Sequence, residues 1–168
     1  MKRFLAAAAL AVLPSMAHAG VGLTWYTGPS FGSKGIWSNP MSLPTIDIHN
    51  EQMLIQLHAL DLVAWLPAKE IALGGDMFMT TRHLKVNEDI GGVIAPGGGL
   101  DILTETGFNA FNVDGQAKLR MGAQTQKGMG FGIYVVPGLG IGAASGSGDT
   151  EFDVVASGQL QISVWTNK

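Results

Sequence analysis

The stretch FDVVASGQLQISVW, from Phe152 to Trp165, alternates apolar and polar side chains. One face carries Phe152, Val154, Ala156, Gly158, Leu160, Ile162 and Val164. The other carries Asp153, Val155, Ser157, Gln159, Gln161, Ser163 and Trp165. A period of two predicts a β-strand with one apolar and one mostly polar face. Strands of soluble proteins usually run about five or six residues, whereas a tilted strand needs roughly nine to eleven residues to cross a bilayer. The length of this stretch therefore raises the question of a membrane.

The same pattern recurs upstream. Between Phe111 and Thr125 every charged or amide side chain falls on even positions, which a helical period would not allow. Between Phe131 and Ala143 the odd positions are bulky and most even positions are glycine, which leaves room for larger side chains across a narrow barrel. Pro137 has no amide donor, so we expect it at a bulge or an unpaired site.

Counting such segments gives about eight strands. They lie near residues 21–27, 45–49, 52–60, 70–84, 91–104, 111–126, 130–144 and 151–165. We predict an all-β fold, a closed antiparallel up-and-down barrel, because closure removes the edges that long strands otherwise expose. The largest candidate outer loops are Gly28–Pro44 and Ser145–Glu151. The segment Asn50–Leu66 is open between a strand over Gln52–Leu60 and a helix capped by Asn50.

The first nineteen residues have the pattern of a secretory signal peptide. Lys2 and Arg3 precede the apolar run Phe4–Leu13, and Ala17-His18-Ala19 has the small-x-small form of a cleavage site. A run of this length is too short for a membrane-spanning helix. We therefore predict a signal peptide over 1–19 and one barrel domain over 20–168.

Composition narrows the class of protein. After residue 19 the chain has 13 acidic and 8 basic side chains, and no basic patch, so a nucleic-acid partner is not expected. There is no Cys, which excludes disulfides and thiolate chemistry. Charged residues are 14% of the chain, against roughly a quarter in ordinary soluble domains. Low charge without a long apolar helix indicates a membrane β-barrel or a very apolar secreted β-protein.

With a signal peptide, eight predicted strands and a repeat of two residues, the mature chain resembles the small eight-stranded outer-membrane barrels of Gram-negative bacteria. The resemblance implies an outer-membrane location, membrane lipid as partner, and a non-enzymatic role that is structural or depends on recognition by loops. Its narrow lumen would be filled by side chains. In this register Trp165 falls on the polar face.

The alternative is a soluble periplasmic or secreted barrel similar to lipocalins, with its apolar faces turned inward around a small apolar ligand. Alternation shows two faces but does not say which is inside. The low charge content favours the membrane version, because a soluble surface normally carries more charge. The sequence leaves the oligomeric state open.

No pattern in the sequence predicts catalysis, a metal or another cofactor. His49, His58 and His83 have no HExxH context, and no G-x-S-x-G motif follows residue 19. Asp101 and Glu105 share a strand face about 13 Å apart, too far for a glycosidase pair. We therefore expect a protein that is not an enzyme.

The polar faces predict a network of charges inside the barrel. It comprises Lys118, Arg120, Asp101, Glu105, Asp76 and Asp114. Two cations in a dry lumen would be unstable without partners. We therefore expect Asp101, Glu105 or Asp76 within ion-pair distance of Lys118 or Arg120.

Overall fold

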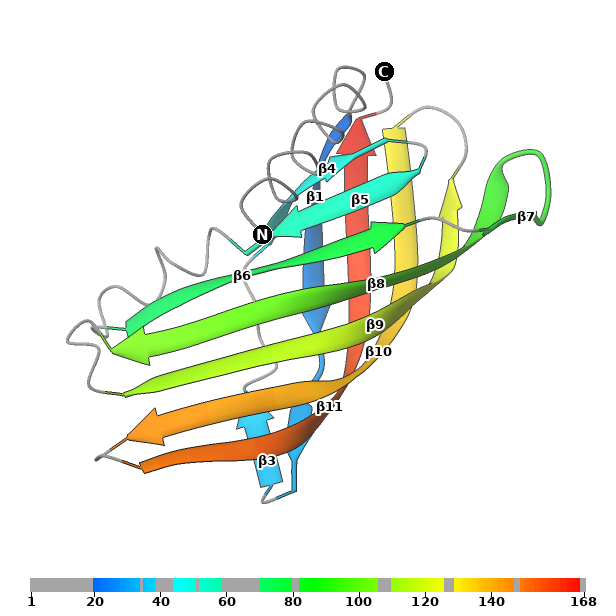
Figure 1. The fold of residues 1–168 in the computed structure, drawn as a ribbon. Coiled ribbons are helices and arrows are strands. Elements are labelled where there is room, and N and C mark those ends of the chain that lie inside the picture. Colours follow the sequence, from blue (N-terminus) through cyan, green and yellow to red (C-terminus); the bar gives the residue numbers. More distant parts are fainter. Residues whose placement is uncertain are drawn as a thin grey trace, which may run out of the picture.

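The computed structural model describes residues 20–33, 35–38, 44–50, 52–58, 70–79, 82–105, 110–125, 129–146 and 149–166. Eight antiparallel strands in these ranges form a closed barrel, and each pairs with the next along the chain before β11 returns to β1 (Figure 1). They are β1 (Gly20–Thr27), β4 (Thr45–His49), β5 (Met53–Leu57), β6 (Glu70–Met79), β8 (Ile90–Glu105), β9 (Phe111–Thr125), β10 (Met129–Gly146) and β11 (Asp149–Thr166). The predicted all-β, up-and-down barrel is confirmed.

Three short strands extend this wall. β2 (Ser30–Gly32) pairs with β11 in the same register as β1 does. Thr27 of β1 pairs with Leu160, and Ser30 of β2 pairs with Ser157. Gly28, with φ of 148°, and Pro29 interrupt the strand, because proline has no amide to donate. β3 (Gly35–Ser38) pairs with β2. The prediction that Gly28–Pro44 is a loop is therefore wrong for these residues, which continue the first hairpin.

The second predicted loop, Ser145–Glu151, is also mostly strand. β10 continues through Gly146 and β11 begins at Asp149, with Gly146 paired to Asp149. Glycine and serine misled the prediction here, because cross-strand pairing overrides their local turn preference. The predicted strand 70–84 is divided, since β7 (Arg82–Lys85) continues β6 along β8 after a register change of one residue.

The segment after Asn50 begins as a strand, so the helical alternative is wrong for Met53–Leu57. The side-chain Oδ1 of Asn50 accepts hydrogen bonds from the amides of Gln52 and Met53, at 2.9 and 2.8 Å. This is a turn between β4 and β5 rather than a helix cap. Residues 59–69, including the rest of this segment, lie outside the described residues.

Strand register sets the width of the barrel. Successive partners of Gly22 are Asp47, Gln56, Asp76, Gly99, Gln116, Gly140 and Val155. Gly22 itself pairs with Trp165, ten residues beyond Val155 on β11. A shear of ten residues over eight strands corresponds to a strand tilt of about 40°, which is normal for a closed barrel.

Pro137 has no partner on β9, as predicted, but it pairs with Gly158 on β11. The ladder between β9 and β10 is interrupted at Val136 and Pro137. The register is the same on both sides of the interruption, with Val135 opposite Met121 and Gly138 opposite Lys118. The missing amide donor of Pro137 is thus tolerated without a bulge.

The polar face of each long strand is turned inward. Buried polar residues include Thr24, Asp47, Gln56, Asp76, Gln116, Lys118, Arg120, Gln159, Gln161 and Ser163. Large apolar side chains are exposed on the outside, among them Leu23, Phe131, Ile133, Val135, Leu139, Ile141, Val154, Leu160 and Ile162. Trp165 lies on the inward side, as its register predicted, in edge contact with His49.

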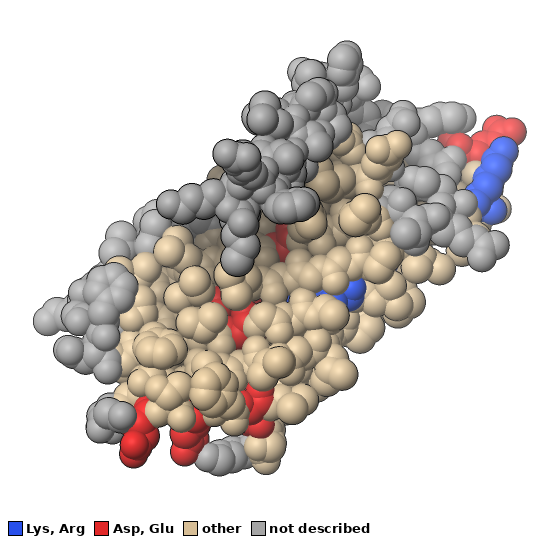
Figure 2. Space-filling model, in the orientation of Figure 1, with Lys and Arg blue, Asp and Glu red and all other residues tan. Residues whose placement is uncertain are grey.

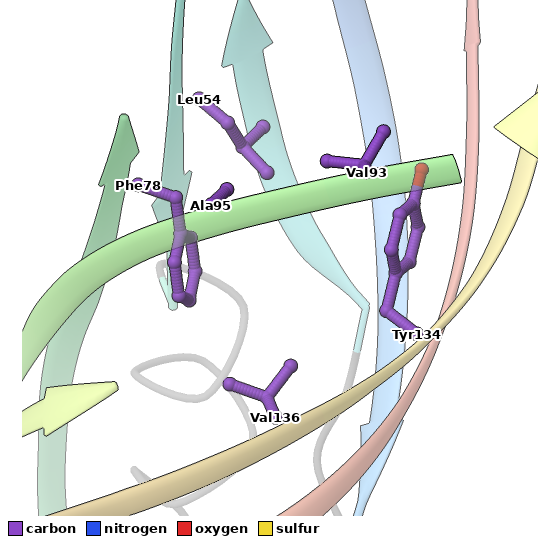
Figure 3. Close-up of a cluster of buried hydrophobic side chains, with 6 residues drawn as sticks. All are labelled: Leu54, Phe78, Val93, Ala95, Tyr134 and Val136. Carbon is purple, nitrogen blue, oxygen red and sulfur yellow. The ribbon is translucent and has the colours of Figure 1, made fainter. Parts of the chain in front are cut away.

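One half of the interior is apolar. Side chains from β5, β6, β8 and β10 point toward one another there (Figure 3): Leu54, Phe78, Val93, Ala95, Tyr134 and Val136. We call the end of the barrel that holds Gly20 and Thr166 the terminal end, and the opposite one the far end. The apolar cluster lies toward the terminal end, because Leu54 and Val93 are near the starts of β5 and β8. The interior therefore divides into an apolar part and a polar part.

Inward glycines lie opposite the bulkiest interior side chains. A Cβ at Gly130 would lie 1.9 Å from Cε2 of Trp165, and one at Gly122 would lie 2.7 Å from Cδ1 of Tyr134. Glycine at these positions leaves the space that the rings fill. These glycines are direct partners of the two aromatic residues on neighbouring strands, so they give room beside the rings rather than from across the lumen.

We predict that Gly130→Ala destabilises the barrel by about 1–3 kcal/mol, because the added methyl displaces Trp165 from a packed interior. Gly158→Ala on β11 is the matched control, since its Cβ would meet nothing within 4 Å. Urea unfolding of the refolded proteins measures both. Equal costs for the two variants would contradict the packing described here.

Candidate functional site

The polar half of the interior is built around an ion pair between β6 and β9. Lys118 Nζ lies 2.7 Å from Asp76 Oδ1, and each side chain is 1% exposed. Asp101 on β8, the strand between them, has its Oδ2 4.0 Å from the same Nζ. A Cβ at Gly99 would lie 1.7 Å from Asp76 Oδ1 and 3.0 Å from Lys118 Nζ, so the pair needs glycine at this position of β8.

His58, directly after β5, joins the same group. Its Nδ1 lies 2.8 Å from Asp101 Oδ1, and its Nε2 lies 3.9 Å from Asp76 Oδ2. Its ring is 5.2 Å from that of Tyr26. We call His58, Asp76, Asp101 and Lys118 the lysine cluster. Two carboxylates lie between two nitrogen bases, an arrangement in which each charge has an opposite neighbour.

Polar side chains extend the lysine cluster toward β11. Asp114 is the direct cross-strand partner of Asp101. Gln116 Nε2 donates to Asp114 Oδ1 at 2.8 Å, and the hydroxyl of Ser157 donates to Gln116 Oε1. These contacts join β8, β9 and β11 across the interior.

Arg120 belongs to a different set of contacts. Its Nε donates to Gln161 Oε1 at 3.1 Å, and its Nη2 donates to Ser163 Oγ at 2.9 Å. Its Cζ lies 3.3 Å from the centroid of the Tyr134 ring, a cation–π contact at the edge of the apolar cluster. Among the described side chains, no carboxylate lies within ion-pair distance of Arg120.

The nearest group of opposite charge to this set is Asp47 on β4. Thr24 Oγ1 and Thr45 Oγ1 donate to its two oxygens at 2.5 and 2.8 Å. Gln56 Nε2 is 3.4 Å from Asp47 Oδ1, and Gln56 Oε1 accepts from Gln161 at 3.2 Å. Neutral amides thus connect a buried carboxylate to the residue that binds Arg120, and the hydrogen bonds replace the water that Asp47 has lost.

The structure brings Lys118, Asp76, Asp101 and Asp114 together, and it places Arg120 apart from them. The side chain of Glu105 lies outside the described part of the chain. Sequence reasoning did not include two interior residues in the network, Asp47 and His58. Both lie on the polar face of a short segment whose side chains alternate. This alternation was the only sequence signal that placed them in the interior.

In the described part of the chain the arrangement places each charge of the lysine cluster beside an opposite one. Both nitrogens of His58 face carboxylates, so neither is directed at an open site. Within the described ranges no group of three or more His, Cys, Asp or Glu side chains could hold a metal ion. A search of the same residues finds no helix with the length and apolar character needed to cross a membrane.

Comparison of the chain with models of protein families, with curated protein sequences and with solved structures finds no match. The similarity to small outer-membrane barrels therefore rests on the residue pattern and on the fold.

We predict that Lys118→Met destabilises the protein by about 3–5 kcal/mol, because it leaves Asp76 buried without its cation. Combining Lys118→Met with Asp76→Leu should restore much of the loss, since the stranded carboxylate is removed as well. Lys85→Met, at an exposed hairpin, is the control and should change stability by less than about 0.5 kcal/mol. Urea titrations of the four proteins would contradict the pairing if the double variant were no more stable than Lys118→Met.

Proposed function

We propose that this chain is a non-enzymatic outer-membrane β-barrel protein of a Gram-negative bacterium, exported by its signal peptide. Its role is structural or depends on recognition by the segments at the far end. The observation that carries the proposal is the facing of the strands: ionic side chains lie in the interior, and large apolar side chains cover the outside. A soluble protein would be more stable with its large apolar side chains inside and its ionic side chains in water.

The height of the apolar surface supports a bilayer. On β10 every second residue from Met129 to Ile141 is exposed and apolar. This run measures about 40 Å along the strand, or about 30 Å along the barrel axis at the tilt derived above. The hydrocarbon core of a bilayer is of similar thickness, about 30 Å.

The distribution of surface charge supports the same location. Five charged residues of the described part are largely exposed: Lys85, Glu88, Asp89, Asp149 and Glu151. All five lie in or beside the hairpins β7–β8 and β10–β11, at the ends of the wall. In Figure 2 charged side chains gather at the two ends of the visible face, and smaller separate charged areas lie between them. A membrane barrel requires its largely exposed charges to lie at the ends of the wall, as these five do.

The connections between strands suggest an orientation. With eight strands both termini lie at one end, where β4–β5 and β9–β10 are joined by only three residues each. The longer connections, between β1 and β4 and between β5 and β6, lie at the far end. Bacterial outer-membrane barrels have short periplasmic turns and longer extracellular loops. We therefore place the terminal end in the periplasm.

The filled interior argues for a role without a wide pore. Eight strands enclose a space that side chains can just fill. Here the apolar cluster fills part of it toward the terminal end, the contacts of Arg120 and Asp47 lie beside that cluster, and the lysine cluster lies further in. The facing also counts against the lipocalin-like alternative, because the large apolar side chains that would line a ligand cavity are on the outside.

Fractionation tests the location. The full-length chain, expressed in a Gram-negative host, should be processed and should stay with the outer membranes after a carbonate wash. A variant that lacks residues 1–19 serves as the control and should remain in the cytoplasm. Recovery of the processed protein in the soluble periplasm would overturn the proposal and favour the lipocalin-like barrel.

We predict a depth-dependent cost of charge on the outer face of β11. Leu160→Arg should cost about 2–4 kcal/mol in lipid bilayers, because residue 160 lies near the middle of the apolar run, whereas Phe152→Arg, near its far end, should cost about 0–1 kcal/mol. Both native side chains are exposed, Leu160 at 45% and Phe152 at 77%. Refolding titrations into vesicles measure the difference. Equal costs would show that this surface does not face hydrocarbon.

A further inference from the structure

Three methionines form a patch on the outer surface of two neighbouring strands. Met53 is the first residue of β5, and Met77 and Met79 lie at the end of β6. Their neighbours Leu54, Gln56, Asp76 and Phe78 are buried, so strand alternation turns all three methionines outward. Met77 is 47% exposed and Met79 is 59% exposed, while Met53 is half-buried. We call these three residues the methionine patch.

Strand register brings the three thioethers within reach of one another. Met53 and Met79 are direct cross-strand partners, and Met77 is opposite Ile55, the next outward residue of β5. Direct partners have Cβ atoms about 4.5–5.5 Å apart, and outward neighbours on one strand are about 7 Å apart. Methionine has three rotatable bonds beyond its Cα, so the sulfur atoms can converge over the centre of this triangle.

The patch differs from the rest of the outer surface. The exposed surface of β1, β10 and β11 consists mainly of Val, Leu, Ile and Phe, which face hydrocarbon equally well. Among the described residues only two other methionines occur: Met121 pairs with Ile94 and Val135, and Met129 pairs with Thr166. Each of these two therefore lacks a methionine as direct strand partner. Generic apolar contact does not require methionine at three adjoining positions.

Two methionines of the patch, Met53 and Met79, lie at the terminal end of their strands. The turn at Asn50–Gln52 directly precedes Met53, and Met79 is the last residue of β6. Met53 and Met79 are thus near the margin of the apolar surface, and Met77 lies two residues further in along β6. On the orientation proposed above, this margin faces the periplasm.

We propose that the methionine patch is a binding site for a soft monovalent cation, Cu⁺, held by the three thioether sulfurs. Soft thioether ligands select Cu⁺, whereas hard cations such as Mg²⁺ and Ca²⁺ prefer oxygen. A site of neutral sulfur atoms needs no deprotonation, so its affinity does not depend on proton release as that of Cys or His sites does. This inference goes beyond the proposed function: the grouping of the three methionines depends on the barrel register, and the access of the site from the periplasm rests on the proposed orientation.

Titration with metal ions tests the site in the purified full-length protein. We expect one Ag⁺, used as an air-stable substitute, or one Cu⁺ under anaerobic conditions, to bind per chain, with an affinity that is unchanged between pH 5.5 and 7.5. Met53→Leu, Met77→Leu and Met79→Leu should each weaken binding at least tenfold, because leucine keeps the volume and apolar character but removes the sulfur. Met129→Leu is the matched control and should bind as the unaltered protein does.

A second measurement needs no substitution. With methionine methyl groups labelled with ¹³C, addition of Ag⁺ should shift the signals of Met53, Met77 and Met79 and leave those of Met121 and Met129 in place. Two results would overturn the proposal. One is an affinity that the three patch variants do not change, or that Met129→Leu lowers equally. The other is a set of methyl shifts that does not include the patch.

Discussion

β11 pairs with β1, and this pairing closes the barrel. Gly22 pairs with Trp165 after a circuit that passes Val155, so closure imposes a shear of ten residues. The shear and the number of strands together determine the tilt and the radius of the barrel. Because all strands then surround one narrow space, their inward side chains must fit and satisfy one another. An open sheet of the same strands would impose no such condition.

The inward side chains meet that condition in two ways, by apolar packing and by ion pairing. Near the terminal end, aromatic and aliphatic side chains fill the space, with glycine on a neighbouring strand giving room to Tyr134 and Trp165. Further in, Lys118 and Asp76 join strands that are not neighbours in the sheet. An ion pair of this kind adds specificity more surely than net stability, because both groups lose hydration on burial. The pair disfavours a slip of either strand by one residue, which would turn the charge on that strand outward and leave its partner buried alone.

The outside of the barrel follows from the same alternation. Once Gln159 and Gln161 are turned inward, Leu160 and Ile162 must point outward, so a polar interior and an apolar exterior form together. A bilayer accepts such an exterior, and water does not. The methionine patch on β5 and β6 lies on this outward face, since register places the three methionines at adjoining positions. Function on this fold therefore depends on which side chains the strands present at their margins.

The strands and their two faces could be predicted without coordinates, because a period of two is local information: the stretch from Phe152 to Trp165 shows it directly. The sequence also implied closure, since strands of this length have edges that need partners. Tertiary structure alone decided which face is inside, and it showed that Gly28–Pro44 contains paired strands. It also decided which carboxylate lies beside Lys118 and that Arg120 binds neutral groups instead. The physical reason is that contacts across a barrel depend on register summed over every strand, which no single segment contains.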